Sequence, residues 1–250
     1  MFESILGSEG LGKFFPEPKK NLMKAEIEKG LGVIDKILSS SDSEIMSRSF
    51  LLDCFLEYGI PYMRSDIFDP WKSVMNANGF GAIQFPTEYV DCLRRVMSLG
   101  ISTAAEIGVF RGGSSYFMTA VLQRINPDFS LTLIDPVDGL LAYDRFSEKL
   151  NLKKAIPSTS RDFRGQSFDL VFIDGDHSYR GAIDDFENLG KYAKKALMFH
   201  DIHAHEFDSK DGGTVRAWGE MKAALRNTHE ICEYAHSVNR SLGLGLAIAQ

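Results

Sequence analysis

Short apolar runs alternate with stretches of helical periodicity from about residue 100 onward. Continuous apolar runs of this length are typical of parallel strands that are buried on both faces. Their alternation with helices predicts a doubly wound α/β sheet. The predicted strands are 101–107, 131–135, 167–174 and 196–201, and the predicted helices between them include 114–123 and 182–194.

The end of the chain breaks this alternation. Two β-rich runs, 229–236 and 242–249, are separated by a turn, so we expect them to be antiparallel strands at the end of the sheet. A nicotinamide-binding Rossmann domain usually continues with parallel strands. The terminal hairpin therefore disfavours that class.

The first hundred residues predict helices and a lid. The glycines and prolines of residues 1–20 indicate a flexible lead-in. The aromatic and glycine-rich segment 69–84 has the composition of a lid that closes over a pocket. The predicted helices are 23–38, a second helix from a Ser41–Glu44 capping box to Tyr58, and 87–98.

We therefore expect residues 1–100 to form a helical N-terminal cap and lid, and residues 101–250 to form the catalytic domain. The apolar residues of the second predicted helix belong either to the core or to a contact in a homo-oligomer. No internal repeat or low-complexity tract is present.

A glycine-rich turn joins the first predicted strand to its helix, at residues 104–115. Gly108, Gly112 and Gly113 lack Cβ atoms where a ligand would approach the backbone, and the helix start offers free N–H groups. The spacing is not Gly-x-Gly-x-x-Gly, because Phe110 stands where a second turn glycine is expected. This weakens a dinucleotide interpretation, and a purely structural turn stays open.

An acid follows at the end of the next strand, about 20 residues after the glycines. At this offset the Asp135 carboxylate can accept hydrogen bonds from both ribose hydroxyls of a nucleoside cofactor. The alternative is that Asp135 caps the next helix, with Pro136 following it.

Polar clusters follow the next two predicted strands. The first contains Asp174, Asp176 and His177, and the second contains His200 and Asp201. Ligands of a doubly wound sheet bind outside the carboxyl ends of its strands, so we expect both clusters to face one pocket. A single charged loop is more often solvated surface. Two such clusters, each after a buried strand, favour a functional site instead.

Three segments carry a resemblance to class I S-adenosylmethionine (SAM) methyltransferases. They are Glu106-x-Gly-x-x-x-Gly-Gly-Ser114, Ile-Asp-Gly-Asp-His-Ser-Tyr at 173–179 and Phe-His-Asp at 199–201. Residues 80–250 resemble the family that includes macrocin-type sugar O-methyltransferases and cephalosporin hydroxylase-like proteins. The resemblance implies a seven-stranded, Rossmann-like methyltransferase sheet of order 3-2-1-4-5-7-6. It also implies methyl transfer from SAM to a hydroxyl of a small polar acceptor, a sugar or glycoside.

The resemblance also implies roles for individual residues. Asp174 and Asp201 would hold Mg²⁺, and His177 would be the general base that deprotonates the acceptor. His200 stands where several relatives have an acid, and an imidazole suits Mn²⁺ better than Mg²⁺, which leaves metal dependence open. The implied SAM contacts are Glu106, Gly108, Phe110, Gly112, Ser114, Asp135 and Asp174; the implied metal ligands are Asp174, His200 and Asp201; Ser160 or Asp162 would lie near adenine.

Other interpretations stay open. His177 could be a turn residue whose ring bonds Asp174 or Asp176. The polar residues after the last parallel strand indicate a mobile loop or a transition-metal site; they are His203, His205, Glu206, Asp208 and Asp211. At the level of function, an NAD-dependent oxidoreductase and a non-catalytic protein that keeps the fold are the rivals.

The composition of the chain limits the classes of binding partner that we expect. The chain has 28 basic and 34 acidic residues, a net charge of −6 and no basic stripe, which disfavours nucleic acid and fits a small neutral or cationic acceptor. Cys54, Cys92 and Cys232 are too far apart for a CxxC site and indicate reduced thiols. No apolar run is long enough to span a membrane, so we expect a cytoplasmic protein.

Overall fold

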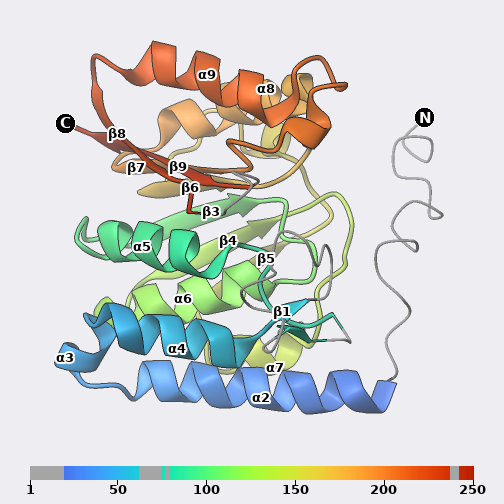
Figure 1. Cartoon of the computed structure of the whole chain (residues 1–250), viewed down its shortest axis with the longest axis vertical. Coiled ribbons are helices and arrows are strands. Elements are labelled where there is room, and N and C mark those ends of the chain that lie inside the picture. The colour runs from blue at the N-terminus through green and yellow to red at the C-terminus, as the bar shows by residue number, and fades with distance from the viewer. Residues whose placement is uncertain (1–19, 62–74, 77–78, 237–241) are drawn as a thin grey trace.

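A seven-stranded sheet forms the centre of the fold, and helices cover both of its faces (Figure 1). The computed structural model describes residues 20–61, 75–76, 79–236 and 242–250. The strands are β3 (Thr103–Ile107), β4 (Ser130–Ile134), β5 (Leu152–Ala155), β6 (Leu170–Ile173), β7 (Ala196–His200), β8 (His229–Tyr234) and β9 (Leu244–Ala249).

The strand order is β5-β4-β3-β6-β7-β9-β8. Numbered along the chain within this sheet, the order is 3-2-1-4-5-7-6, so the predicted topology is confirmed. The strands from β5 to β7 are parallel, whereas β9 runs antiparallel to β7 and to β8. The last strand in sequence is therefore an inner strand of the sheet. The central strands β6 and β7 are buried along their full length, as their continuous apolar runs predicted.

Helices form one layer on one face and two layers on the other. The helices α8 (Tyr179–Asn188) and α9 (Gly213–Leu225) cover one face. On the opposite face lie α5 (Pro86–Met97) and α6 (Gly113–Ile125), and α2 (Lys20–Leu38) and α4 (Arg48–Tyr58) form an outer layer over them (Figure 1). The shorter elements are α3 (Asp42–Ile45), α7 (Tyr143–Ser147), β1 (Ile60–Pro61), β2 (Met75–Asn76) and the 3₁₀ turns η2 (Ser160–Phe163), η3 (Gly190–Tyr192) and η4 (His205–Phe207).

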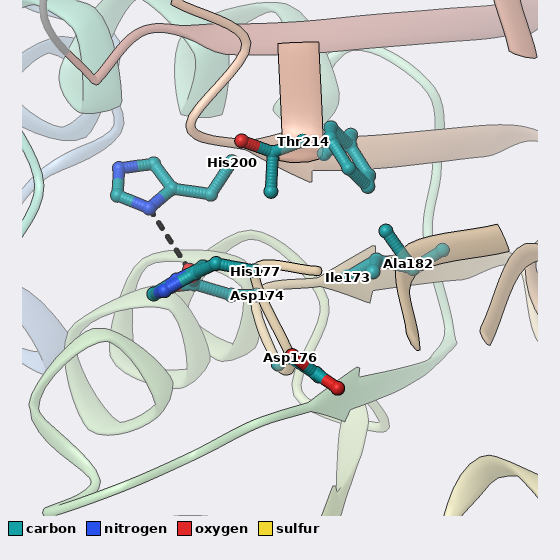
Figure 2. Close-up of a pocket in the computed structure, with 9 residues that line it drawn as sticks. Ile173, Asp174, Asp176, His177, Ala182, His200 and Thr214 are labelled. Atoms are coloured by element: carbon teal, nitrogen blue, oxygen red, sulfur yellow. Dashed lines mark hydrogen bonds and ion pairs between the residues drawn. The ribbon is translucent and has the colours of Figure 1, made fainter. Parts of the chain in front are cut away.

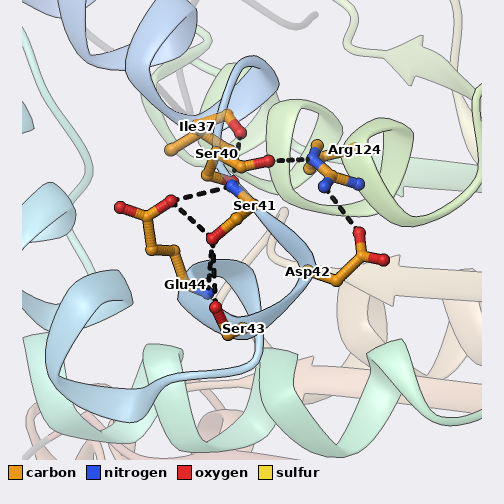
Figure 3. A network of polar contacts seen from close by, with 7 residues as sticks. All are labelled: Ile37, Ser40, Ser41, Asp42, Ser43, Glu44 and Arg124. Carbon is orange, nitrogen blue, oxygen red and sulfur yellow. Dashed lines mark hydrogen bonds and ion pairs between the residues drawn. The ribbon is translucent and has the colours of Figure 1, made fainter.

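The predicted capping box is present, but the helix that it begins is short. Ser41 accepts a hydrogen bond from the N–H of Glu44, and the Glu44 carboxylate accepts one from the N–H of Ser41 (Figure 3). The prediction of one helix from here to Tyr58 is wrong, because Ser47 adopts an extended conformation and caps a new helix through the N–H of Phe50. Arg124 of α6 then bonds the carbonyl of Ser40 and so ties this corner to the inner helix layer (Figure 3).

The N-terminal helices share a core with the sheet. One apolar cluster extends from Leu31 of α2 through Phe117 of α6 to Ile248 of β9. The predicted division near residue 100 is not tested by this packing and stays a prediction. The predicted lead-in lies outside the described residues except for its last residue, and half of the predicted lid, 69–74 and 77–78, lies outside them as well. Within the described part of the chain, no helix is long and apolar enough to cross a membrane.

Candidate active site

The glycine turn between β3 and α6 is tightly packed. Gly108 has φ 84°, and a Cβ on it would lie 2.3 Å from the carbonyl oxygen of Asp174. Gly112, the N-cap of α6, has the same φ, and its Cβ would meet the ring of Tyr116 at 2.5 Å. The protein's own atoms therefore already require glycine at these two positions. That they also admit a cofactor stays a prediction.

Asp135 holds this turn in place. Its Oδ2 accepts hydrogen bonds from the N–H groups of Val109 (3.0 Å) and Phe110 (3.1 Å), and its Oδ1 accepts one from Val137 at 2.9 Å. A carboxylate oxygen has two lone pairs, so Oδ2 has no acceptor site left and Oδ1 keeps one. A ribose could therefore share Asp135 through Oδ1, but the predicted bonding of both hydroxyls would require the turn to give up N–H contacts.

Glu106 is a buried acid beside the turn. Its Oε1 accepts a hydrogen bond of 2.6 Å from Ser114, whereas its Oε2 is buried and has no partner. Burial raises the pKa of Glu106 to about 8. An unpartnered acceptor of this kind fits a cationic or N–H-bearing ligand group, which agrees with the predicted contact to the methionine end of SAM.

The carboxyl ends of β6 and β7 bring the two predicted polar clusters together. Asp174 follows β6, and its Oδ1 lies 2.9 Å from Nδ1 of His200, the last residue of β7 (Figure 2). A carboxylate accepts hydrogen bonds, so Nδ1 donates. Nε2 of His200 is buried without a partner. Gln84 donates its amide N–H to the other oxygen of Asp174, at 2.8 Å.

His177 approaches the same cluster from the loop after β6. Its Nε2 lies 3.0 Å from Oδ2 of Asp201, and its ring stacks on Phe207 at 4.3 Å between centroids. The partner of His177 is thus Asp201, and neither of the two acids considered from the sequence. Asp176 instead accepts hydrogen bonds from Ser178.

Asp174, His177 and Asp201 form a candidate metal site. One ligand atom from each lies within 4.8 Å of the others. His200 is not part of this group, and its role as a ligand stays a prediction. Asp201 is nearly fully buried and adopts φ 61°, a left-handed conformation that is uncommon outside glycine and typical of strained functional positions.

The charges of this cluster compensate one another. Burial opposes ionisation of His200, but Asp174 and Asp201 outweigh it and raise the pKa of His200 to about 10. Burial likewise opposes the charge of His177, and Asp201 more than offsets it, so the pKa of His177 lies above its ordinary value. Burial alone would raise the pKa of Asp201, yet His200 and His177 hold it below its ordinary value.

A small recess opens at this cluster, lined by residues that include Asp174, His177, His200 and Thr214 (Figure 2). Its cavity volume is about 10 Å³, which is close to the space that one water molecule needs. The recess by itself is therefore too small for a whole nucleoside cofactor.

The remaining predicted residues lie apart from the cluster or serve other contacts. His205 pairs with Asp208 on the surface, and Asp211 pairs with Arg216. Among the described residues, the group of Asp174, His177 and Asp201 is the one close enough to share an ion, so the alternative metal site in the following loop has no support. Ser160 donates to Asp185 at 2.6 Å, and Oδ2 of Asp162 accepts a hydrogen bond from the N–H of Thr159; a contact of either residue with adenine stays a prediction.

Two residues of the site were not found from the sequence. Gln84 contacts Asp174 from a loop some 90 positions earlier, and Phe207 stacks on His177 from η4. Gln84 lies outside the charged clusters that follow predicted strands, and Phe207 lies within the polar loop after the last parallel strand but is itself apolar. The aromatic, glycine-rich composition around Gln84 was the sole hint that its segment lies near the pocket.

A family comparison matches part of the chain. Residues 105–202 match a family described as a methyltransferase domain, and the matched residues run from strand β3 to strand β7 of a sheet with the strand order of class I methyltransferases. The glycine turn, Asp135, Asp174 and the end of β7 all fall within the matched residues. The narrower resemblance to macrocin-type sugar methyltransferases stays a prediction.

Solved structures with this fold include several methyltransferases. An O-methyltransferase from Bacillus cereus in complex with SAH has a TM-score of 0.52 at 13% identity, over 87% of this chain and 95% of its own. A putative O-methyltransferase from Klebsiella pneumoniae has a TM-score of 0.50 at 16% identity, over 68% of this chain and 82% of its own. Cofactor-bound Rv0187 from MTB has a TM-score of 0.52 at 16% identity, over 67% of this chain and 81% of its own. At these identities the likeness is one of fold. A comparison with curated proteins finds no match.

Proposed function

We propose that this protein is a SAM-dependent O-methyltransferase that acts on a hydroxyl of a small polar acceptor, a sugar or glycoside. The observation that carries the proposal is the cluster of Asp174, His177 and Asp201 at the carboxyl ends of β6 and β7, beside the glycine turn of a methyltransferase domain. Two carboxylates and an imidazole at this edge of the sheet supply the groups that deprotonation of a hydroxyl requires.

The glycine turn fits SAM. Glu106 offers a buried, unpartnered carboxyl oxygen to the ammonium group of the methionine part, and Asp135 keeps one acceptor site at Oδ1 for a ribose hydroxyl. When bound, SAM supplies an already activated methyl group, so the protein has to orient the acceptor and remove its proton.

The acid cluster fits a divalent cation. Asp174 and Asp201 are hard oxygen donors, and an imidazole ligand, the role expected of His200, would shift the preference from Mg²⁺ towards Mn²⁺. Such a cation lowers the pKa of hydroxyl groups that it binds. Both the presence of a cation at this cluster and its identity are part of the proposal.

His177 is the proposed base. Because Nε2 faces Asp201, this nitrogen carries a proton towards the carboxylate, and Nδ1 is the atom that takes the proton of the acceptor hydroxyl. The acceptor oxygen forms the new C–O bond while the C–S bond of the cofactor breaks. Phe207 fixes the plane of the His177 ring by stacking.

Calorimetry with SAM and with NAD tests the cofactor. We expect saturable binding of SAM and no binding of NAD. The antiparallel strand β9 and the match to a methyltransferase domain also argue against an NAD-dependent dehydrogenase. Failure to bind SAM would refute the proposal and favour a non-catalytic role for the fold.

The acceptor and the metal need a turnover assay. Release of S-adenosylhomocysteine with a panel of neutral methyl glycosides tests the acceptor class. Exhaustive treatment with EDTA should abolish turnover, and Mn²⁺ should restore it at least as well as Mg²⁺. Full activity after chelation would remove the metal from the proposal and leave Asp174 as a hydrogen-bond acceptor for substrate.

A further inference from the structure

Gln84 lies on a segment that is fixed beside the cofactor turn. The N–H of Ala82 donates to the carbonyl of Gly59 at 3.2 Å, and Arg111 of the turn donates to the carbonyl of Gly79 at 2.8 Å. A Cβ on Gly113, at the start of α6, would lie 1.7 Å from the carbonyl oxygen of Gly81. The backbone that carries Gln84 therefore has little freedom to shift.

The side chain of Gln84 reaches from this segment to Asp174. Its Nε2 lies 2.8 Å from Oδ2 of Asp174, and the side chain is 2% exposed. The carboxylate can accept but not donate, so the orientation of the amide is fixed with the N–H towards Asp174. The carbonyl oxygen then faces away, and it is buried without a partner.

This arrangement is unfavourable for stability alone. A buried carbonyl without a hydrogen bond carries a desolvation cost, and an apolar side chain of similar size at this position would avoid it. Asp174, in contrast, gains from the contact: His200 holds Oδ1 and Gln84 holds Oδ2, so the plane of the carboxylate is set from both sides.

We propose that Gln84 is a positioning residue that orients the Asp174 carboxylate for the reaction. The inference rests on the proposed function, in which Asp174 serves the metal or the acceptor. Partners that orient a ligating carboxylate change metal affinity by about 10- to 100-fold when they are removed.

The test compares Gln84→Met with a matched control. Methionine keeps most of the volume and removes both polar atoms. Gln123→Met is the control, because Gln123 also bonds through its amide, to Lys149 and Asn151, at the far end of α6. Three quantities are measured on the full chain: the melting temperature, the affinity for Mn²⁺ alone by electron paramagnetic resonance, and the imidazole N–H proton resonance of His200 in ¹⁵N-histidine-labelled protein.

We expect Gln84→Met to melt at the wild-type temperature or above it, to bind Mn²⁺ about 10-fold or more weakly, and to shift the His200 resonance. Gln123→Met should leave the Mn²⁺ affinity and the resonance unchanged. Gln84→Glu should have a larger effect on Mn²⁺ affinity than Gln84→Met, because a second carboxylate replaces the donor to Asp174.

Two results would overturn the inference. One is an unchanged His200 resonance in Gln84→Met, which means that Gln84 does not set the carboxylate. The other is a large loss of melting temperature, which means that Gln84 serves the fold. If the wild-type protein binds no Mn²⁺, the metal in the proposed function fails, and the His200 resonance still decides the role of Gln84.

Discussion

Glu106 has a carboxyl group whose ionisation opposes folding. Its pKa is about 8 in the folded protein against 4.5 in the unfolded chain, so the folded state binds more protons between these two values. Stability contributed by this group therefore falls as the pH rises from 4.5 to 8 and stays low above that range. Binding of SAM would reverse this penalty, since a cation beside Oε2 favours the charged form.

Glu106→Gln should separate the two effects. We expect the variant to be more stable than the wild type at pH 8.5, with a smaller difference at pH 5, in urea unfolding without cofactor. Its affinity for SAM should fall by about 10-fold or more, as expected for the loss of a charge-assisted hydrogen bond. A variant that is less stable at pH 8.5 would show that the carboxylate is stabilised in the free protein.

His177→Ala tests the base directly. We expect kcat to fall by about 10²- to 10⁴-fold with little change in the dissociation constant for SAM. His205→Ala is the matched control, because His205 pairs with Asp208 at the surface and should tolerate the change. A near-normal kcat in His177→Ala would mean that ionisation of the acceptor needs no imidazole at this position.

The pH dependence of the wild-type rate is a second test of His177 as the base. A base works in its neutral form, and Asp201 raises the pKa of His177 above the ordinary value of 6.5. The rate should therefore rise with pH through a midpoint above 6.5. A bound cation would lower that midpoint, so a midpoint at or below 6.5 in the Mn²⁺-loaded enzyme would indicate a cation close to His177.

Single residues of the site were predictable where they follow buried strands. Asp174, His177 and Asp201 converge because parallel strands place their carboxyl ends at one edge, and this depends on sequence order alone. Which group each of these side chains contacts depends on residues from distant segments of the chain. Asp135 serves the backbone of the turn, Asp201 pairs with His177, and Gln84 supports Asp174. No local pattern contains these pairings.

At the level of elements, the start of α6 is where packing is tightest. A Cβ on Gly113 would lie 1.7 Å from the carbonyl oxygen of Gly81, which is backbone and cannot move aside freely. We expect Gly113→Ala to destabilise the protein by about 1–3 kcal/mol or more, as overpacking does, and to weaken SAM binding by displacing the turn.

Gly219→Ala provides the control within a second helix. Gly219 lies in α9, and its Cβ would have no atom within 4 Å. Alanine there should raise stability by about 0.5–1 kcal/mol, because glycine is the poorer helix former. Chemical denaturation of both variants measures the difference. Equal effects would show that helix propensity alone, and no contact with Gly81, governs these positions.

Asp135 connects the end of β4 to the turn after β3. Asp135→Ala would leave the N–H groups of Val109, Phe110 and Val137 without their acceptor. We expect a loss of about 1–3 kcal/mol in the free energy of unfolding together with weaker SAM binding. Calorimetry and urea unfolding on the same variant measure both. Unchanged SAM affinity would show that neither Asp135 nor the turn conformation that it maintains contributes to SAM binding.

Element boundaries were less predictable than element types. The capping box at Ser41 was recognised because both of its hydrogen bonds are local. The break at Met46 was missed, because Ser47 begins a new helix within an apolar, helix-compatible stretch. The packing of α4 against α5 and α2 then determines that the long helix begins after Ser47 and not after Ser41.

At the level of the whole molecule, the helical layers of the first hundred residues are joined to the sheet by one core. Residues 101–250 made alone would expose the apolar faces of α6, β8 and β9 that α2, α4 and α5 cover. We expect this fragment to aggregate or to lack a cooperative thermal transition, and the full chain to unfold in one step. A stable, cooperative fragment would show that the boundary near residue 100 separates two independent folding units.

The pattern of four apolar runs with helices between them and a terminal hairpin predicted the parallel sheet and its antiparallel end, whereas the strand order came from the resemblance to class I methyltransferases. The two helical layers on one face were not, since periodicity shows that a helix has an apolar side and does not show what covers it. Residues 1–20 and 69–84 were predicted to be a lead-in and a lid; nearly all of the first segment and half of the second fall outside the described residues.

The inner position of β9 has a consequence for synthesis of the protein. Residues 244–249 are translated after every other strand, yet they fill the place between β7 and β8. Until they leave the ribosome, the nascent chain exposes the unpaired edge of β7, and β8 lacks its partner. The sheet is therefore completed after translation has passed its last strand, and a nascent chain stalled before residue 244 would be a natural client for chaperones.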